Sequence, residues 1–124
     1  MFESDGIQIY CGDFFALPSH VLNEISAVYD RASLVALPCE MREQYISKMQ
    51  SLLPENTQTL LVAFTYPQHE MQAPPFSVDS TEVERLFDCC DIKHLYSEEI
   101  SDKEPHFKAR GVSFIQEDVY LIIH

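Results

Sequence analysis

The segment Thr59-Leu60-Leu61-Val62-Ala63-Phe64-Thr65-Tyr66 is the most apolar run in this chain of 124 residues. Its hydrophobic residues are continuous rather than alternating, which is typical of a central strand covered on both faces of a sheet. A loop follows, because residues 67–77 contain three prolines and cannot form a helix or a central strand. The run therefore predicts the centre of a sheet that ends at a rigid loop.

Helices are predicted on either side of this strand. Apolar residues recur at helical spacing between Pro38 and Pro54, and residues 79–82 have the capping-box character that opens a second helix. Shorter segments rich in strand formers lie at residues 7–11, 25–29 and 92–96. Residues 112–115 and 119–123 predict a closing hairpin that turns at Glu117 and Asp118. This order predicts an α/β fold with a mostly parallel sheet and a C-terminal antiparallel hairpin.

Composition excludes several classes of protein. Hydrophobic residues make up 46% of the chain, which indicates a folded rather than a disordered protein. A net charge of -12 argues against nucleic acid or an anionic membrane as a partner, since both bind basic surfaces. No apolar run reaches the roughly 20 residues of a membrane span, and residues 1–6 are not a secretory signal. We therefore expect a cytoplasmic protein.

The cysteines and histidines do not predict a metal site. Cys89 and Cys90 are adjacent, no CxxC pattern occurs, and the five histidines are scattered. Reduced, partly buried thiols are the simpler interpretation.

Polar residues follow the predicted strands, where α/β sheets bind ligands at the carboxyl ends of their strands. Asp13, Asp30, Arg31 and the loop after Tyr66 should share this rim. The glycine-rich turn that opens a nucleotide-binding α/β domain is not found, because Gly6, Gly12 and Gly111 are the only glycines and form no GxGxxG-like cluster.

Four segments resemble the thiopurine S-methyltransferase family, in the same order. They are IYCGDFF (9–15), AVYDRASLVALP (27–38), PPFSV (74–78) and EVERLF (82–87). The likeness runs from about Gly6 to the end of the chain but covers only the later half of the family's domain. It implies that residues 1–124 are the C-terminal part of a class I, Rossmann-like methyltransferase domain that lacks the N-terminal glycine-rich cofactor-binding segment.

The resemblance implies methyl transfer from S-adenosylmethionine to an aromatic or heterocyclic thiol, and bacterial members are also associated with selenium and tellurium compounds. Since the sulfonium is already activated, the protein mainly has to hold a small-molecule thiol in line with the methyl group. A full-length form is expected to be a monomer. The isolated chain, without the glycine-rich loop, is expected to bind the cofactor weakly or not at all.

Cofactor-binding positions carried over from the family are Asp13, Phe14 and Arg31. Asp13 and Phe14 match positions that line the adenine pocket, and Arg31 matches an arginine beside cofactor and substrate, where a fixed cation favours thiolate character. From the residues alone, Asp13 also suits a turn or cap, and Arg31 also suits a surface salt bridge with Asp30.

Substrate-binding positions are Arg31, Pro75, Phe76 and His106. The loop that contains Pro75 and Phe76 resembles the family's active-site cover, with Phe76 able to stack on a planar substrate; a rigid surface loop with one buried Phe is the alternative. His106 stands where relatives usually carry arginine, so Lys108 or Arg110 is an alternative cation.

Three functions remain open at this point. The first is a thiopurine S-methyltransferase whose N-terminal part lies outside this sequence. The second is an inactive remnant or a non-catalytic interaction module derived from that family. The third is a different α/β domain that binds a small molecule.

Overall fold

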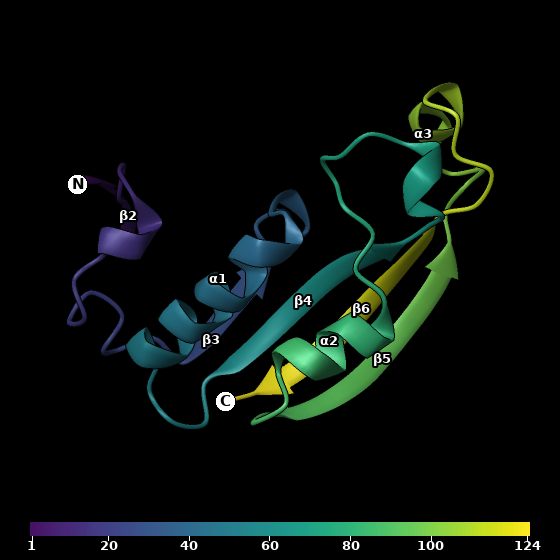
Figure 1. Ribbon diagram of the computed structural model, residues 1–124. Coiled ribbons are helices and arrows are strands. Elements are labelled where there is room, and N and C mark those ends of the chain that lie inside the picture. Colours follow the sequence, from purple (N-terminus) through teal and green to yellow (C-terminus); the bar gives the residue numbers. More distant parts are fainter.

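The computed structural model describes residues 1–124, with a four-stranded sheet, helices packed on one of its faces and a separate hairpin (Figure 1). The strand order is β3-β4-β6-β5. The strands are β3 (Ala27–Asp30), β4 (Gln58–Thr65), β5 (Asp91–Glu99) and β6 (Gln116–Ile123). The helices are α1 (Cys39–Leu52), α2 (Ser80–Leu86) and α3 (Pro105–Ala109), with 3-10 turns η1 (Phe14–Ala16), η2 (Leu34–Ala36) and η3 (Gln68–Glu70).

The apolar run forms β4, a central strand, as its composition predicts. It pairs in parallel with β3 and antiparallel with β6. Leu61 and Ala63 are fully buried beneath the helices. Leu60, on the opposite face, is 37% exposed, so only one face of this strand is covered by helices.

Both predicted helices are confirmed. α1 follows Pro38 and buries Tyr45 and Met49 against the sheet. At the start of α2, a carboxylate oxygen of Asp79 accepts a hydrogen bond of 2.9 Å from the backbone N–H of Glu82, which satisfies one of the free donors of the first turn. The α/β fold class is thus confirmed.

The sheet, however, is mixed rather than mostly parallel, because β6 runs antiparallel to both of its neighbours. The predicted hairpin at residues 112–123 is wrong: β6 is one continuous strand and its antiparallel partners are β4 and β5. Glu117 and Asp118 suggest a turn, but the carboxylate of Asp118 is buried and accepts hydrogen bonds from the hydroxyls of Thr65 and Ser97. These donors on neighbouring strands allow a charged residue to lie inside the sheet.

The strand expected at residues 7–11 does not belong to the main sheet. β2 (Ile7–Ile9) pairs only with β1 (Phe2–Ser4), around a turn at Asp5 and Gly6 with φ of 49° and 82°. Every residue of these two strands is exposed. Local turn geometry therefore forms this hairpin, since positive φ at both central positions suits a tight two-residue turn.

The charged residues 98–108 are partly ordered into the end of β5 and most of α3. A small second core lies beneath α3, where Phe107 packs with Ile100 and Ile115. No helix in the structure has the length and hydrophobicity needed to cross a membrane.

Candidate functional site

The loop after β3 is held by a buried carboxylate. One oxygen of Asp30 accepts hydrogen bonds from the backbone N–H groups of Ser33 (3.1 Å) and Leu34 (3.3 Å). The other oxygen accepts from the Tyr45 hydroxyl at 2.8 Å. Burial, and then the nearby Asp30 charge, raise the pKa of Tyr45 well above its usual range, so this hydroxyl remains a donor. The network fixes the backbone on both sides of Arg31.

Arg31 itself is exposed, and its side chain makes no salt bridge or hydrogen bond within the chain. The alternative of an ion pair with Asp30 is therefore not realised, because the Asp30 oxygens are occupied by other donors. Arg31 and His106 line the same small cavity of about 160 Å³, together with Glu104 and Glu117. Nδ1 of His106 lies 3.4 Å from a carboxylate oxygen of Glu104. The structure thus brings together two of the predicted substrate-binding residues.

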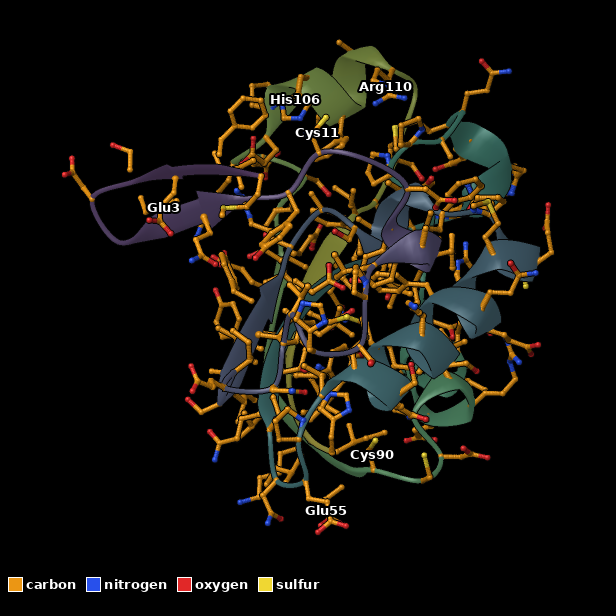
Figure 2. All side chains as sticks on the ribbon, turned by 90° about the vertical axis from the view of Figure 1, so that its left-hand side faces the viewer. Glu3, Cys11, Glu55, Cys90, His106 and Arg110 are labelled. Carbon is orange, nitrogen blue, oxygen red and sulfur yellow. The ribbon has the colours of Figure 1, made fainter.

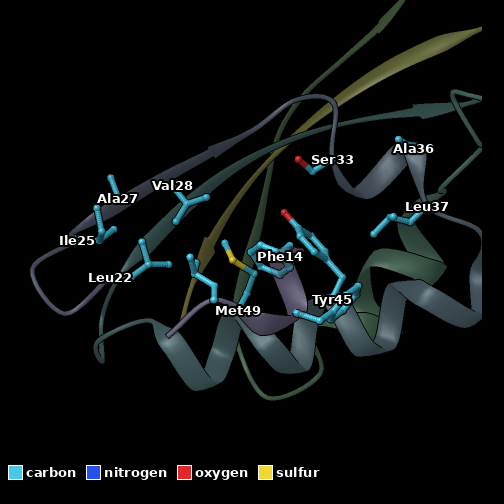
Figure 3. A pocket seen from close by; sticks show the side chains of 12 residues that line it. Phe14, Leu22, Ile25, Ala27, Val28, Ser33, Ala36, Leu37, Tyr45 and Met49 are labelled. Atoms are coloured by element: carbon cyan, nitrogen blue, oxygen red, sulfur yellow. The ribbon is translucent and has the colours of Figure 1, made fainter. Parts of the chain in front are cut away.

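A larger cavity of about 550 Å³ lies between η1, β3 and α1 (Figure 3). Phe14 forms one wall, with its ring centroid 5.2 Å from that of Tyr45. Apart from Ser33, the lining is hydrophobic, and it includes Leu22, Val28 and Met49. The volume falls within the usual range of small-molecule sites, roughly 300–1,000 Å³. An apolar lining of this kind suits a flat heterocycle rather than a charged group.

Asp13 lies beside this cavity and caps η1. Its Oδ1 accepts a hydrogen bond of 2.9 Å from the backbone N–H of Phe15, as the turn-and-cap interpretation predicts. The hydrogen bonds of the chain leave Oδ2 without a partner. Asp13 lines a neighbouring hollow of about 370 Å³ that shares Phe14 and Leu17 with the larger cavity. One carboxylate oxygen of Asp13 is therefore available to accept a hydrogen bond in the smaller hollow.

Pro75 and Phe76 lie outside these three cavities. The Phe76 ring is half-buried against the main core, and the guanidinium carbon of Arg42 lies 5.2 Å from its centroid. The Pro75 carbonyl accepts a hydrogen bond of 2.6 Å from the Tyr66 hydroxyl. In this conformation Phe76 is a packed residue of a rigid loop, and its ring lines none of these three cavities.

Arg110 connects this loop to α3. Its guanidinium donates hydrogen bonds to the carbonyls of Gln72 and Pro74, so it is committed to the loop backbone. His106 and Arg110 both lie at the end of the molecule formed by α3 (Figure 2). Of the two alternative cations at this place, Lys108 forms an ion pair with Asp102. Arg31 is thus the free arginine of the rim.

The sequence analysis did not identify Tyr45 and Arg42 as residues that support the site. Both lie on the buried face of α1, where Arg42 also donates through Nε to the Leu37 carbonyl at 3.0 Å. The available signal was a charged residue three positions before Tyr45 on the apolar stripe, since such a charge is buried only with partners. The structure contains no group of three or more His, Cys, Asp or Glu side chains placed to hold a metal ion.

Comparison with protein families gives a match over residues 1–124 to "Thiopurine S-methyltransferase (TPMT)". Thiopurine S-methyltransferase of Nitrosospira multiformis is 44% identical over 122 residues, which are 98% of this chain and 56% of the relative. The enzymes so named from Xanthomonas axonopodis pv. citri and Vibrio campbellii are 45% and 41% identical, over 96% and 98% of this chain and 55% of each relative. The chain spans about half the length of these curated relatives and matches their C-terminal half.

Solved structures show the same fold at low identity. TehB from Haemophilus influenzae superposes with a TM-score of 0.60 at 12% identity, over 92% of this chain and 40% of that protein. A putative O-methyltransferase from Nostoc punctiforme gives a TM-score of 0.53 at 14% identity, over 93% of this chain and 35% of that protein. These similarities confirm a methyltransferase-type α/β fold.

Proposed function

The chain belongs to the thiopurine S-methyltransferase family, and on this premise we propose that it supplies the C-terminal part of an S-adenosylmethionine-dependent enzyme that methylates aromatic or heterocyclic thiols. The observation that carries the proposal is the 44% identity to a named thiopurine S-methyltransferase over nearly the whole chain. The alternative of an inactive remnant or interaction module is not favoured by these similarities. Residues 1–124 then form the C-terminal part of a class I methyltransferase domain.

The residues at the larger cavity and at the hollow beside it fit the adenine end of the cofactor. Phe14 and Val28 offer apolar surface to the ring, and the free oxygen of Asp13 suits the exocyclic amine. S-adenosylmethionine, when bound, supplies an activated methyl group. The lining has no charged residue for the methionine end, so this chain provides only part of the cofactor's contacts.

We assign Arg31 to the acceptor side of the reaction. It is an unpaired cation at the carboxyl end of β3, held by the Asp30 network and facing the cavity that includes His106. A guanidinium near the acceptor stabilises a thiolate, which is the nucleophilic form of the substrate. Pro75 and Phe76 join this assignment as the substrate cover only if the loop moves, because Phe76 is packed beneath Arg42 in the present conformation.

The remaining assignments follow from the same premise. The partner is a small-molecule thiol, selenium and tellurium compounds being further candidates, and the location is the cytoplasm. The net charge of -12 argues against binding of nucleic acid or an anionic membrane. A monomer is the expected state of a full-length form.

The test is a chimera in which the part of the Nitrosospira multiformis relative that precedes the match is joined to this chain. We expect methyl transfer to a thiopurine, followed with radiolabelled S-adenosylmethionine, and loss of at least tenfold in kcat/KM for Arg31→Ala. Arg31→Lys keeps the charge and should retain part of the activity, while Lys48→Ala, which removes a cation from α1, should retain all of it. A folded chimera that binds S-adenosylhomocysteine but methylates no thiol would contradict the proposed function. Full activity in Arg31→Ala would contradict only the role of Arg31.

A further inference from the structure

Cys89 and Cys90 lie in the turn that joins α2 to β5. In a strand, the side chains of neighbouring residues point to opposite faces, so adjacent cysteines are kept apart. In this turn both sulfur atoms contact a single atom of α1. Nε2 of Gln50 lies 3.1 Å from Sγ of Cys89 and 3.6 Å from Sγ of Cys90. The turn therefore presents two free thiols on the same side of the backbone.

Packing explains only one of these two cysteines. Cys90 is half-buried against the main hydrophobic core, where a free cysteine acts as a small apolar residue. Cys89 is exposed and packs on neither hydrophobic core. Cys11 and Cys39 are exposed as well, but neither has another cysteine beside it in the sequence. Cys89 and Cys90 are thus the one vicinal dithiol of the chain.

The surroundings make the two thiols unequal. Burial, and then the neighbouring Cys89, raise the pKa of Cys90 to about 11, so Cys90 by itself is a weak nucleophile. Nδ1 of His124 lies 3.8 Å from Sγ of Cys90, and Nε2 of the same ring lies 2.6 Å from the Thr59 hydroxyl oxygen. Burial lowers the pKa of His124, so the ring is neutral at about pH 7 and can take up a thiol proton. Cys89, which is exposed, is the thiol that a reagent from solvent meets first.

The number of donors decides which soft electrophile fits this pair. A structural zinc ion needs four donors, and no group of three or more His, Cys, Asp or Glu side chains is placed to hold a metal ion. Thiolates prefer soft centres. A trivalent arsenic atom that carries one carbon substituent has two bonds left for sulfur. Two adjacent thiols therefore saturate it without a further protein ligand.

We infer that Cys89 and Cys90 form a binding site for monosubstituted trivalent arsenicals, of which hydrated phenylarsine oxide is an example. The sulfur of Cys89 displaces one hydroxide from arsenic, and the sulfur of Cys90 then displaces the second and closes a ring. Two As–O bonds break and two As–S bonds form, while the two thiol protons leave with the hydroxides as water. Arsenic stays trivalent and the sulfurs keep their oxidation state, so no oxidant or reductant is required. Ring closure is intramolecular, which offsets the weak nucleophilicity of Cys90.

This dithiol site is separate from the proposed methyl-transfer site. Figure 2 shows Cys90 at the same end of the molecule as Glu55, and His106 and Arg110 at the opposite end. Neither cysteine lines any of the three cavities described above. The inference therefore goes beyond the proposed function and requires no methyl transfer.

The test is titration of the reduced 124-residue chain with phenylarsine oxide in a buffer without thiols, followed by native mass spectrometry. We expect one phenylarsenic group per chain, retained in excess 2-mercaptoethanol and removed by 2,3-dimercaptopropanol, because only another dithiol can form a comparable ring. Cys89→Ser and Cys90→Ser each leave one arsenic–sulfur bond, so each should weaken binding at least about a hundredfold. Cys11→Ser and Cys39→Ser, which remove single exposed thiols, are the matched controls and should leave binding unchanged. The circular dichroism spectrum of the loaded chain should match that of the free chain.

Three results would overturn the inference. The first is binding in Cys89→Ser or Cys90→Ser that equals binding in the parent, and the second is the absence of any adduct in the parent. The third is stronger binding in urea than in native buffer, since the site would then belong to the unfolded chain rather than to the turn held against Gln50. Because Cys89 is exposed, Cys89→Ser should fold like the parent and keeps the test decisive if Cys90→Ser is unfolded. Methyl transfer is not measured, so these results leave the proposed function unaffected.

Discussion

Replacing Tyr45 by phenylalanine removes one hydroxyl from the network that fixes the loop carrying Arg31. The Asp30 oxygen that accepts from Tyr45 at 2.8 Å has no other donor, and Asp30 is 6% exposed. Water therefore cannot easily replace the hydroxyl. A hydrogen bond to a charged group is worth about 1.5–3 kcal/mol, so Tyr45→Phe should lower the free energy of unfolding by about that amount.

The assay is urea unfolding followed by circular dichroism at low protein concentration. For a domain of this size, a loss of 1 kcal/mol corresponds to roughly 4 °C in Tm, so thermal scans should show a decrease of about 6–12 °C. A double-mutant cycle with Asp30→Ala measures the coupling free energy between Tyr45 and Asp30. Tyr45→Phe should lower the free energy of unfolding much less when the Asp30 carboxylate has already been removed.

Tyr10→Phe is the matched control, because the Tyr10 hydroxyl donates to Gln8 at 3.3 Å on the exposed hairpin. Its removal should change stability by less than about 0.5 kcal/mol. If Tyr45→Phe behaved like this control, or if its effect added to that of Asp30→Ala without coupling, the buried network would not be what holds the loop. In the chimera, Tyr45→Phe should also lower kcat/KM by displacing Arg31, while Tyr10→Phe should not.

Three further results are expected. Burial raises the pKa of Cys90 to about 11, so at about pH 8 iodoacetamide should alkylate it more slowly than exposed Cys39; mass spectra of quenched samples that show equal rates would contradict this. Burial lowers the pKa of His124 in the folded chain, so protonation of this histidine favours the unfolded chain. The stability contributed by the neutral His124 is therefore present above about pH 6.5 and is lost as the pH falls below that value. His124→Asn should therefore reduce the decrease in the free energy of unfolding between about pH 7 and pH 5.5. An unchanged decrease in the variant would contradict this prediction. Arg110→Ala removes the hydrogen bonds by which Arg110 holds the Gln72 and Pro74 carbonyls of the proline-rich loop. Exchange of the amides at residues 72, 73, 76 and 77 should therefore quicken, while global stability changes by less than about 1 kcal/mol; unchanged exchange would show that these hydrogen bonds are not needed to hold the loop.

Local chemistry was enough to predict much of the fold. The continuous apolar run at residues 59–66 identified β4, and the helical periodicity after Pro38 identified α1. The cap at Asp79 was equally visible, because a capping residue acts within four positions of the chain. The predicted placement of Arg31 directly after a strand was also right.

The errors came from contacts between distant segments. Asp118 is a residue type common in turns, and a turn was predicted there. Instead it lies inside β6, where hydroxyls from β4 and β5 donate hydrogen bonds to its carboxylate. The strand at residues 7–9 was expected in the main sheet, yet it pairs only with its sequence neighbour. A single sequence does not show which distant donor or strand is available, so neither outcome follows from propensity alone.

The site divides in the same way. The sequence by itself determined the family, the α/β class and the identity of Asp13, Phe14, Arg31 and His106 as candidates. Only the tertiary structure decided that Arg31 and His106 share a cavity and that Phe76 is packed elsewhere. The physical reason is that hydrophobic periodicity and turn chemistry act over a few residues. The register of β3, β4 and β6, and therefore the meeting of side chains from residues 31 and 106, is set by long-range packing.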